Sequence, residues 1–235
     1  MSIIVLFIVF LVGLLVLGFV LKKVGGWISF AVPIALLAIV IALGLWIMLD
    51  ANSLKNHFYQ DNKLFILDID GTAAGAFTLG RSDIPVPVGD LSLIKGYYPD
   101  LAKIQGNNYK VIVLNWSIVE ADIDVLNFKA TKEELKSALS SDNPRQLFID
   151  KTSQAFGGGM LADLTAQVIS LYPTSNFFAS SMFAILAAKP LLNSDLVFAG
   201  MREGTVRVYP ETAVFKIIKL LPEDLAKILI PVKGG

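Results

Sequence analysis

The stretch "KLFILDIDGTAAGAFTLG", residues 63–80, decides how the folded part of this chain is built. Its first half is an apolar run that predicts a β-strand, and its second half predicts another. Between the two halves stand Asp70 and Gly71, and an Asp-Gly pair supplies the positive φ angles that a tight turn requires. The stretch therefore predicts a β-hairpin that leaves Asp68 and Asp70 in solvent. The side chains expected to face the core are Phe65, Leu67 and Ile69.

The chain after this hairpin shows strand patterns first and helix patterns later. Residues 84–89, "IPVPVG", predict an extended edge segment, because proline cannot donate a ladder hydrogen bond. Residues 109–128 contain the longest strand signal. Helices are predicted over residues 130–141, 142–156, 157–173 and 174–192. A last hairpin, turning at Glu203–Gly204, precedes two short amphipathic helices that Pro222 separates. This order favours the α+β class, with one mixed domain over residues 63–235.

The beginning of the chain is far more hydrophobic than the remainder. The whole chain is 54 % hydrophobic, yet residues 1–50 contain only three charged side chains. Residues 3–21 and residues 27–49 carry no charge, and each run reaches the length of about 20 residues that crosses a bilayer. We therefore predict a two-helix transmembrane hairpin over residues 1–50, joined to the domain by a polar linker over residues 51–62.

Two features of these runs concern their surroundings in a membrane. Trp27 and Trp46 are separated by about 28 Å along a helix, which would place one indole near each membrane interface. Four alanines of the second run share one helix face and form a smooth stripe, against which another helix can pack closely. They are Ala31, Ala35, Ala38 and Ala42. The stripe predicts contact with the first span, with another membrane protein or with a second copy of the chain.

Charge sets the expected orientation and excludes one class of partner. Lys22 and Lys23 lie in the connector between the two runs, and the positive-inside rule places such a connector in the cytoplasm. The folded domain is then expected to be extracytoplasmic. The formal net charge of zero gives no basic stripe, so nucleic acid is not an expected partner. The chain contains no cysteine, which excludes disulfides and thiolate metal sites.

Asp68, Asp70 and Thr72 also form the pattern DxDGT at the end of an apolar strand. This pattern resembles the nucleophile motif of the haloacid dehalogenase-like phosphatases. The resemblance implies that Asp68 is the nucleophile, that Asp70 is the general acid/base beside Mg²⁺, and that Thr72 is a structural residue. Residues 110–117, "KVIVLNWS", resemble the second strand of that family, which implies that Ser117 binds phosphate.

Three features of the sequence depart from that family. The late strand-like run "LVFAG", residues 196–200, is followed by Met201, Arg202 and Glu203, where the family has a GDxxxD or DD motif. The DxDGT pattern is followed at once by a return strand, and the alternating strand–helix order of a doubly wound sheet is missing. The hairpin is therefore the favoured interpretation of residues 63–80, and a Mg²⁺-dependent phosphohydrolase is the alternative.

Two weaker patterns complete the list of candidate sites. Glu120, Asp122 and Asp124 alternate along a predicted strand, so their carboxylates share one face. A solvated sheet face is the favoured interpretation, and a divalent metal site is the weaker one. Residues 160–190 are apolar on most sides, which is typical of core helices or of the wall of an apolar pocket.

These observations favour a function without catalysis. We expect a membrane-anchored accessory or binding protein, acting as a subunit or scaffold of a membrane complex and needing no cofactor. The expected partners are the lipid bilayer and another membrane protein or a second copy of the chain. The alternatives are the phosphohydrolase and a domain that binds lipid or another apolar ligand.

Overall fold

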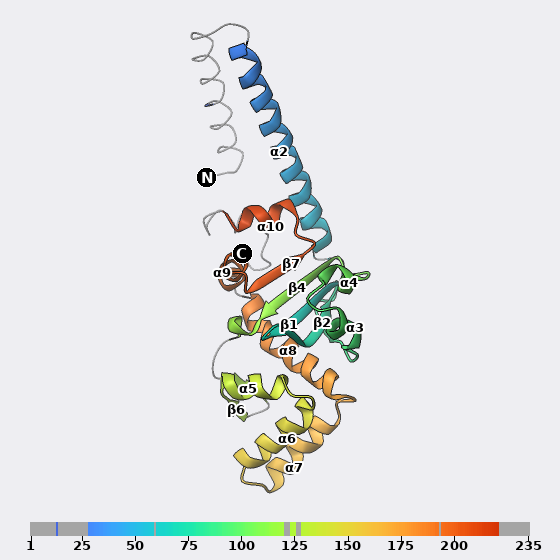
Figure 1. The fold of residues 1–235 in the computed structure, drawn as a ribbon. Helices are drawn as coiled ribbons and strands as arrows, with labels where there is room; N and C mark the ends of the chain where they lie inside the picture. The colour runs from blue at the N-terminus through green and yellow to red at the C-terminus, as the bar shows by residue number, and fades with distance from the viewer. Residues whose placement is uncertain are drawn as a thin grey trace. The chain divides into compact units, whose positions relative to one another are not determined.

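Figure 1 shows the fold in the computed structural model, which describes residues 13, 28–58, 60–119, 123–125, 128–192 and 194–220. The chain divides into two compact units, Met1–Asn52 and Ser53–Gly235, and each is considered by itself. The second unit combines a five-stranded sheet with many helices. The mixed α+β class predicted from the sequence is therefore confirmed.

Helix α2, Ile28–Phe58, is the apolar helix near the start of the chain. Over Ile34–Phe58 it is long and apolar enough to cross a membrane, judged by length and composition. The helix continues through the first eight residues of the predicted linker over residues 51–62. One N-terminal apolar helix is thus present among the described residues, and the two-helix hairpin stays a prediction.

The predicted contact residues of this region are only partly described. Ala35, Ala38 and Ala42 are exposed on α2, and the side chain of Trp46 is exposed as well. The side chain of Ala31, the whole of Trp27 and all of residues 3–21 except Gly13 lie outside the described part of the chain.

The main sheet of the second unit has the strand order β3-β2-β1-β4-β7. Strands β1 and β4 are parallel, whereas the other three neighbouring pairs are antiparallel. The strands are β1 (Lys63–Ile69), β2 (Thr72–Leu79), β3 (Pro85–Pro87), β4 (Lys110–Asn115) and β7 (Val206–Tyr209). A separate two-stranded ladder joins β5 (Ile123–Val125) to β6 (Phe128–Ala130).

The predicted hairpin over residues 63–80 is confirmed as β1 and β2. Asp70 has φ of 51° and Gly71 has φ of 81°, and two consecutive positive φ angles are what a two-residue type I′ turn requires. The pairing register shifts by one residue between Leu67 and Asp68, where the ladder has a bulge. The bulge lies directly before Asp68, whose carboxylate organises the site described below.

One face of the sheet is covered by helix α8, Ser175–Leu192. A side chain at Gly75 would lie 3.0 Å from the carbonyl oxygen of Ala179, so the absence of a Cβ there lets strand β2 and helix α8 approach closely. The rings of Phe77 and Phe183 are 5.0 Å apart between centroids, and Phe183 is fully buried. This ring contact forms part of the core between β2 and α8.

The opposite face of the sheet is covered by two short helices, α3 (Ser92–Tyr97) and α4 (Leu101–Gln105). Ile94 and Ile104 from these helices pack into a core cluster with Leu64 and Ile66 of β1. All seven residues of β1 are therefore buried. The prediction that Phe65, Leu67 and Ile69 face the core is confirmed.

The prediction that Asp68 is solvated is wrong. Asp68 is only 6 % exposed, because the face of β1 on which it lies is covered rather than open to water. Asp70, in the turn beyond the strand, is exposed as predicted.

The remaining helices of the second unit follow β6 and flank β7. Helix α5 begins with a capping box in which Thr131 and Glu134 bond each other's backbone N–H groups, and α6 begins with Asn143 as cap and Pro144 at the first position. The bounds are α5 (Lys132–Leu139), α6 (Pro144–Ala155), α7 (Met160–Ser170), α9 (Ser194–Glu203) and α10 (Ala213–Ile218), with one 3₁₀ turn at Trp116–Ile118.

The predicted hairpin turning at Glu203–Gly204 is a helix followed by a strand instead. Phe198 and Met201 are buried and three positions apart within α9, so the apolar residues from "LVFAG" onward follow a helical period. Gly204 has φ of 79° and directly follows the last residue of α9. A left-handed glycine at that position ends a helix, which explains why Glu-Gly resembled a hairpin turn.

Strand β3 forms one edge of the sheet, as the prolines predicted. The N–H of Val88 donates to the carbonyl oxygen of Ala76 on β2, so alternate residues along this segment direct their backbone groups toward β2. Pro85 and Pro87 occupy the intervening positions, whose nitrogens face the open side.

Candidate functional site

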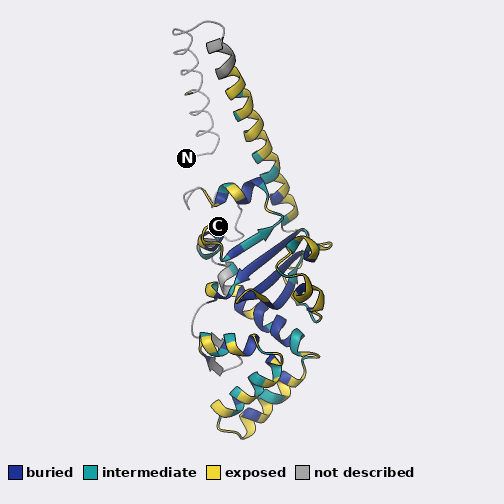
Figure 2. Cartoon of the chain, in the orientation of Figure 1, coloured by how far each residue is buried: buried dark blue, intermediate teal, exposed yellow. Residues whose placement is uncertain are grey.

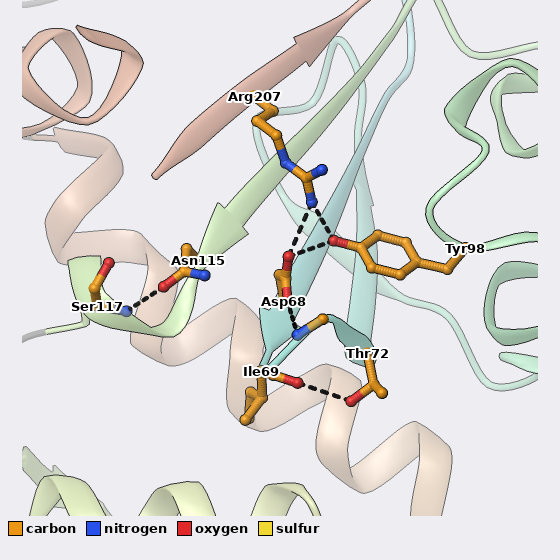
Figure 3. Close-up of polar contacts among 8 residues, drawn as sticks. Asp68, Ile69, Thr72, Tyr98, Asn115, Ser117 and Arg207 are labelled. Carbon is orange, nitrogen blue, oxygen red and sulfur yellow. Dashed lines mark hydrogen bonds and ion pairs between the residues drawn. The ribbon is translucent and has the colours of Figure 1, made fainter. Parts of the chain in front are cut away.

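Three polar side chains meet at the carboxyl end of β1 (Figure 3). Asp68 is the second-last residue of β1, Tyr98 directly follows helix α3, and Arg207 lies on β7. Tyr98 is 30 residues and Arg207 is 139 residues from Asp68 in the sequence. The fold therefore brings together three segments whose relation no local pattern indicates.

Both carboxylate oxygens of Asp68 accept hydrogen bonds. Oδ2 accepts from the Tyr98 hydroxyl at 2.5 Å and from Nη2 of Arg207 at 2.9 Å. Oδ1 accepts from the backbone N–H of Gly71 at 2.8 Å, which fixes the hairpin turn. Arg207 also donates from Nη2 to the hydroxyl oxygen of Tyr98. The carboxylate thus connects the turn, α3 and β7.

The Asp68 carboxylate is largely buried, so the loss of one of these contacts would lower the stability of the fold. The side chain of Asp68 is 9 % exposed, and that of Arg207 is 42 % exposed. A buried carboxylate requires both a partner charge and hydrogen bonds to offset its lost hydration. Burial, followed by the hydrogen bond to Asp68, raises the pKa of the Tyr98 phenol far above its usual value. Tyr98 therefore stays protonated and remains a donor to Asp68 at any physiological pH.

The other residues of the DxDGT pattern make separate contacts. Asp70 is exposed and forms an ion pair with Nζ of Lys136 at 2.8 Å, which ties the turn to α5. The Thr72 hydroxyl donates to the carbonyl oxygen of Ile69 at 2.8 Å, closing the turn from the β2 side. Figure 3 shows both Asp68 and Thr72 contacting backbone groups of the hairpin turn.

Ser117 follows the end of β4, the strand parallel to β1. Asn115 is in register with Asp68 on these neighbouring strands. The side chain of Asn115 accepts a hydrogen bond from the backbone N–H of Ser117 at 2.9 Å, and the carbonyl oxygen of Ser117 accepts one from Lys132 at 3.0 Å. Ser117 is exposed, at the same end of the sheet as Asp68 but on the next strand.

These residues do not fit the Mg²⁺ ion that the phosphatase resemblance implies. Mg²⁺ takes carboxylate and other oxygen ligands in octahedral geometry. Here the guanidinium of Arg207 occupies Oδ2 of Asp68, and Lys136 occupies the carboxylate of Asp70. Each of the two carboxylates is thus already paired with a cationic side chain. Within the described ranges, no group of three or more His, Cys, Asp or Glu side chains could hold a metal.

The weaker carboxylate candidates cannot be placed. Glu120 and Asp122 lie outside the described residues, and Asp124 is on β5 with its side chain undescribed. The metal site suggested by their alternation stays a prediction.

A cavity of about 250 Å³ opens next to the Asp68 cluster. Tyr98 and Gly71, which both donate to Asp68, line this cavity, and Lys95 and Asp142 are the charged groups in its wall. The remaining lining residues are Thr72, Ala73, Ala74, Leu139, Ser140 and Ser141. The hydroxyls of Ser140 and Ser141 donate to backbone carbonyls of α5, which leaves them mainly as acceptors toward the cavity.

Two buried lysines at the opposite end of the sheet were not anticipated from the sequence. Lys63 and Lys110 are in register at the start of β1 and β4, and both are almost fully buried. Nζ of Lys63 donates to the carbonyl oxygens of Phe58 and Asp61, and burial lowers its pKa. Nζ of Lys110 donates to Pro210 at 2.7 Å and lies 5.4 Å from the centre of the Phe215 ring. A lysine at the first position of an apolar strand is the only signal that could have indicated them.

Comparison with known proteins gives this site no precedent. No family model, no curated protein and no solved structure matches the chain. The resemblance to haloacid dehalogenase-like phosphatases therefore rests on the quoted residues alone.

Proposed function

We propose that this chain is a membrane-anchored, non-catalytic accessory or binding protein that acts as a subunit or scaffold of a membrane complex. The length and composition of α2 support the anchor. The proposal keeps the folded unit extracytoplasmic, because Lys22 and Lys23 favour a cytoplasmic connector. Its expected partners are the bilayer and another membrane protein or a second copy of the chain.

The proposal that the protein is non-catalytic rests on the hydrogen bonds of the Asp68 carboxylate. A carboxylate nucleophile must present an oxygen to its substrate, as phosphoryl-transfer and glycosidase carboxylates do. Both oxygens of Asp68 are instead engaged by Tyr98, Arg207 and Gly71. The residue that the sequence offered as the best catalytic candidate has the contacts of a structural group that joins three elements.

We expect that extraction of the full chain from native membranes in mild detergent will yield a complex with a stoichiometric partner protein. Leucine at Ala35 and Ala38 together should lose that partner, because the larger side chains hold a neighbouring helix away from the small-residue stripe. The measurement is the mass and composition of the purified complex.

The matched control exchanges Ile39 and Ile41 of the same helix for leucine, which conserves side-chain volume. The control should keep the partner. A wild-type chain that elutes without any other protein would contradict the proposal. If leucine at Ala35 and Ala38 leaves the complex unchanged, the alanine stripe of α2 is not part of its interface.

A Mg²⁺-dependent phosphohydrolase remains the second candidate, and one observation favours it. Asp68 and Asn115 are in register near the carboxyl ends of the parallel strands β1 and β4, and Ser117 follows β4 at the same sheet end as the DxDGT pattern. Hydrolysis of an aryl phosphate that disappears in Asp68→Asn but persists in Tyr98→Phe would support this alternative. We expect no such activity above background, because Arg207 and Lys136 neutralise the two carboxylates.

A further inference from the structure

Helix α7 presents apolar side chains to solvent along its length. Met160 is 78 % exposed, Leu171 directly after the helix is 81 % exposed, and Leu161, Leu164 and Val168 are between 44 % and 63 % exposed. We call these five side chains the α7 stripe. Figure 2 shows α7 as largely exposed, and α6 is the helix on which it packs. The stripe therefore lies on the side of α7 that none of the described elements buries.

The stripe is a second apolar face, distinct from the one that holds α7 in the fold. At 3.6 residues per turn its five positions span an arc of about 100°. The buried residues of α7, Ala162 and Ile169, lie about 140° from the centre of that arc. An arc of this width is typical of the face a helix turns toward a core. A helix that is apolar on two faces is normally covered on both.

Charge discriminates between the possible occupants of this face. Residues 157–176 contain one charged side chain, Asp163, and no lysine or arginine. A helix that lies on a membrane surface needs basic residues beside its apolar face to meet anionic headgroups. Asp163 is on the polar side of the helix, so it would not oppose a protein surface that covers the stripe. These features favour a protein and disfavour lipid.

The spacing of the stripe is the same in both directions along the helix. Leu161, Leu164, Val168 and Leu171 are separated by three, four and three residues. A two-fold axis near Ala166 therefore places Leu161 opposite Leu171 of a second copy and Leu164 opposite Val168. An interface of this isologous kind needs only one self-complementary surface. The 3–4–3 spacing is also the one at which apolar side chains interlock between two helices.

The exposed area is sufficient for such a contact. Five side chains with these exposures present an area on the order of 500 Å². Two copies would bury roughly 1,000 Å² in total, which is the size at which specific interfaces begin. We propose that the α7 stripe is an antiparallel homodimer interface between two copies of this chain. This proposal is argued from the residues of α7 alone and does not depend on the proposed accessory function.

The native chain lacks cysteine, so introduced cysteines test this geometry cleanly. Full-length chains carrying Leu161→Cys and chains carrying Leu171→Cys are mixed in detergent, reconstituted and oxidised. The mixture should form an intermolecular disulfide, because a disulfide needs Cα atoms within about 7 Å. Each variant alone should not, because the two Leu161 positions of an antiparallel pair are about 15 Å apart. Cross-linking of Leu161→Cys with itself would overturn the antiparallel arrangement.

A charge variant tests whether the stripe itself makes the contact. Leu164→Glu should reduce the cross-linked yield at least about tenfold, because it buries a carboxylate against an apolar side chain. Ser170→Glu adds the same charge about 130° from the centre of the stripe, at an exposed position on the polar side of α7, and should leave the yield unchanged. Equal yields from the two variants, or a chain that stays monomeric and binds phosphatidylcholine vesicles through α7, would overturn the proposal. Copurification of an unrelated protein seated on α7 would overturn it as well.

Discussion

Leucine in place of Arg207 is expected to lower the free energy of unfolding by about 3 kcal/mol. Among the described residues, Arg207 is the one cation in contact with the Asp68 carboxylate, and its removal leaves that carboxylate buried with two neutral donors. The value lies at the lower end of the range for a broken buried pair, because Arg207 itself is 42 % exposed. The midpoint of thermal unfolding should fall by roughly 6–12 °C, measured by near-ultraviolet circular dichroism of the full chain in detergent.

The control for this prediction is Arg81→Leu, since Arg81 is exposed in the loop after β2. Its midpoint should shift by no more than a degree or two. The double variant with leucine at both Asp68 and Arg207 should be more stable than the sum of the single changes predicts, because no charge is then left buried without its partner. Strict additivity would show that the two groups do not interact in solution.

Alanine in place of Phe183 should cost about 4 kcal/mol, the larger of the two effects. Phe183 is fully buried where α8 meets β2, and its ring packs against that of Phe77. Removing it leaves a cavity that cannot close readily, because the backbones of Gly75 and Ala179 are already in close contact. Urea unfolding of the full chain in detergent should show the loss as a lower midpoint at an unchanged slope.

Ile185→Ala on the same helix provides the comparison, because that side chain is 51 % exposed. It removes fewer buried atoms from the same segment and should cost less than about 1 kcal/mol. If the two substitutions were equally destabilising, helix propensity or the detergent would explain the loss and packing against the sheet would not.

Local chemistry made the first hairpin predictable. Asp70 and Gly71 have the backbone angles that an Asp-Gly turn needs, and the proline-rich segment lies at the sheet edge. Both features depend on neighbours in the sequence. The same reasoning failed at Gly204, where one left-handed glycine serves equally to turn a hairpin and to end a helix.

The cluster around Asp68 was not predictable by the same means. Whether that residue is solvated depends on what covers the second face of β1, and the cover comes from α3 and α4. Its cation comes from β7, 139 residues away. Period-two alternation indicates that two faces of a strand differ, but it does not say that one of them is open. Burial of a short carboxylate within an apolar strand can only be read from the tertiary structure.

The prolines of β3 have a consequence for behaviour at high concentration. An exposed edge strand normally offers a row of free N–H and C=O groups, and another chain can extend the sheet there and start aggregation. At this edge the outward-facing positions are Pro85 and Pro87, so the edge offers carbonyl acceptors without backbone donors at those sites. A foreign strand could form only half of its ladder there. The sheet is thereby protected against open-ended growth through this edge.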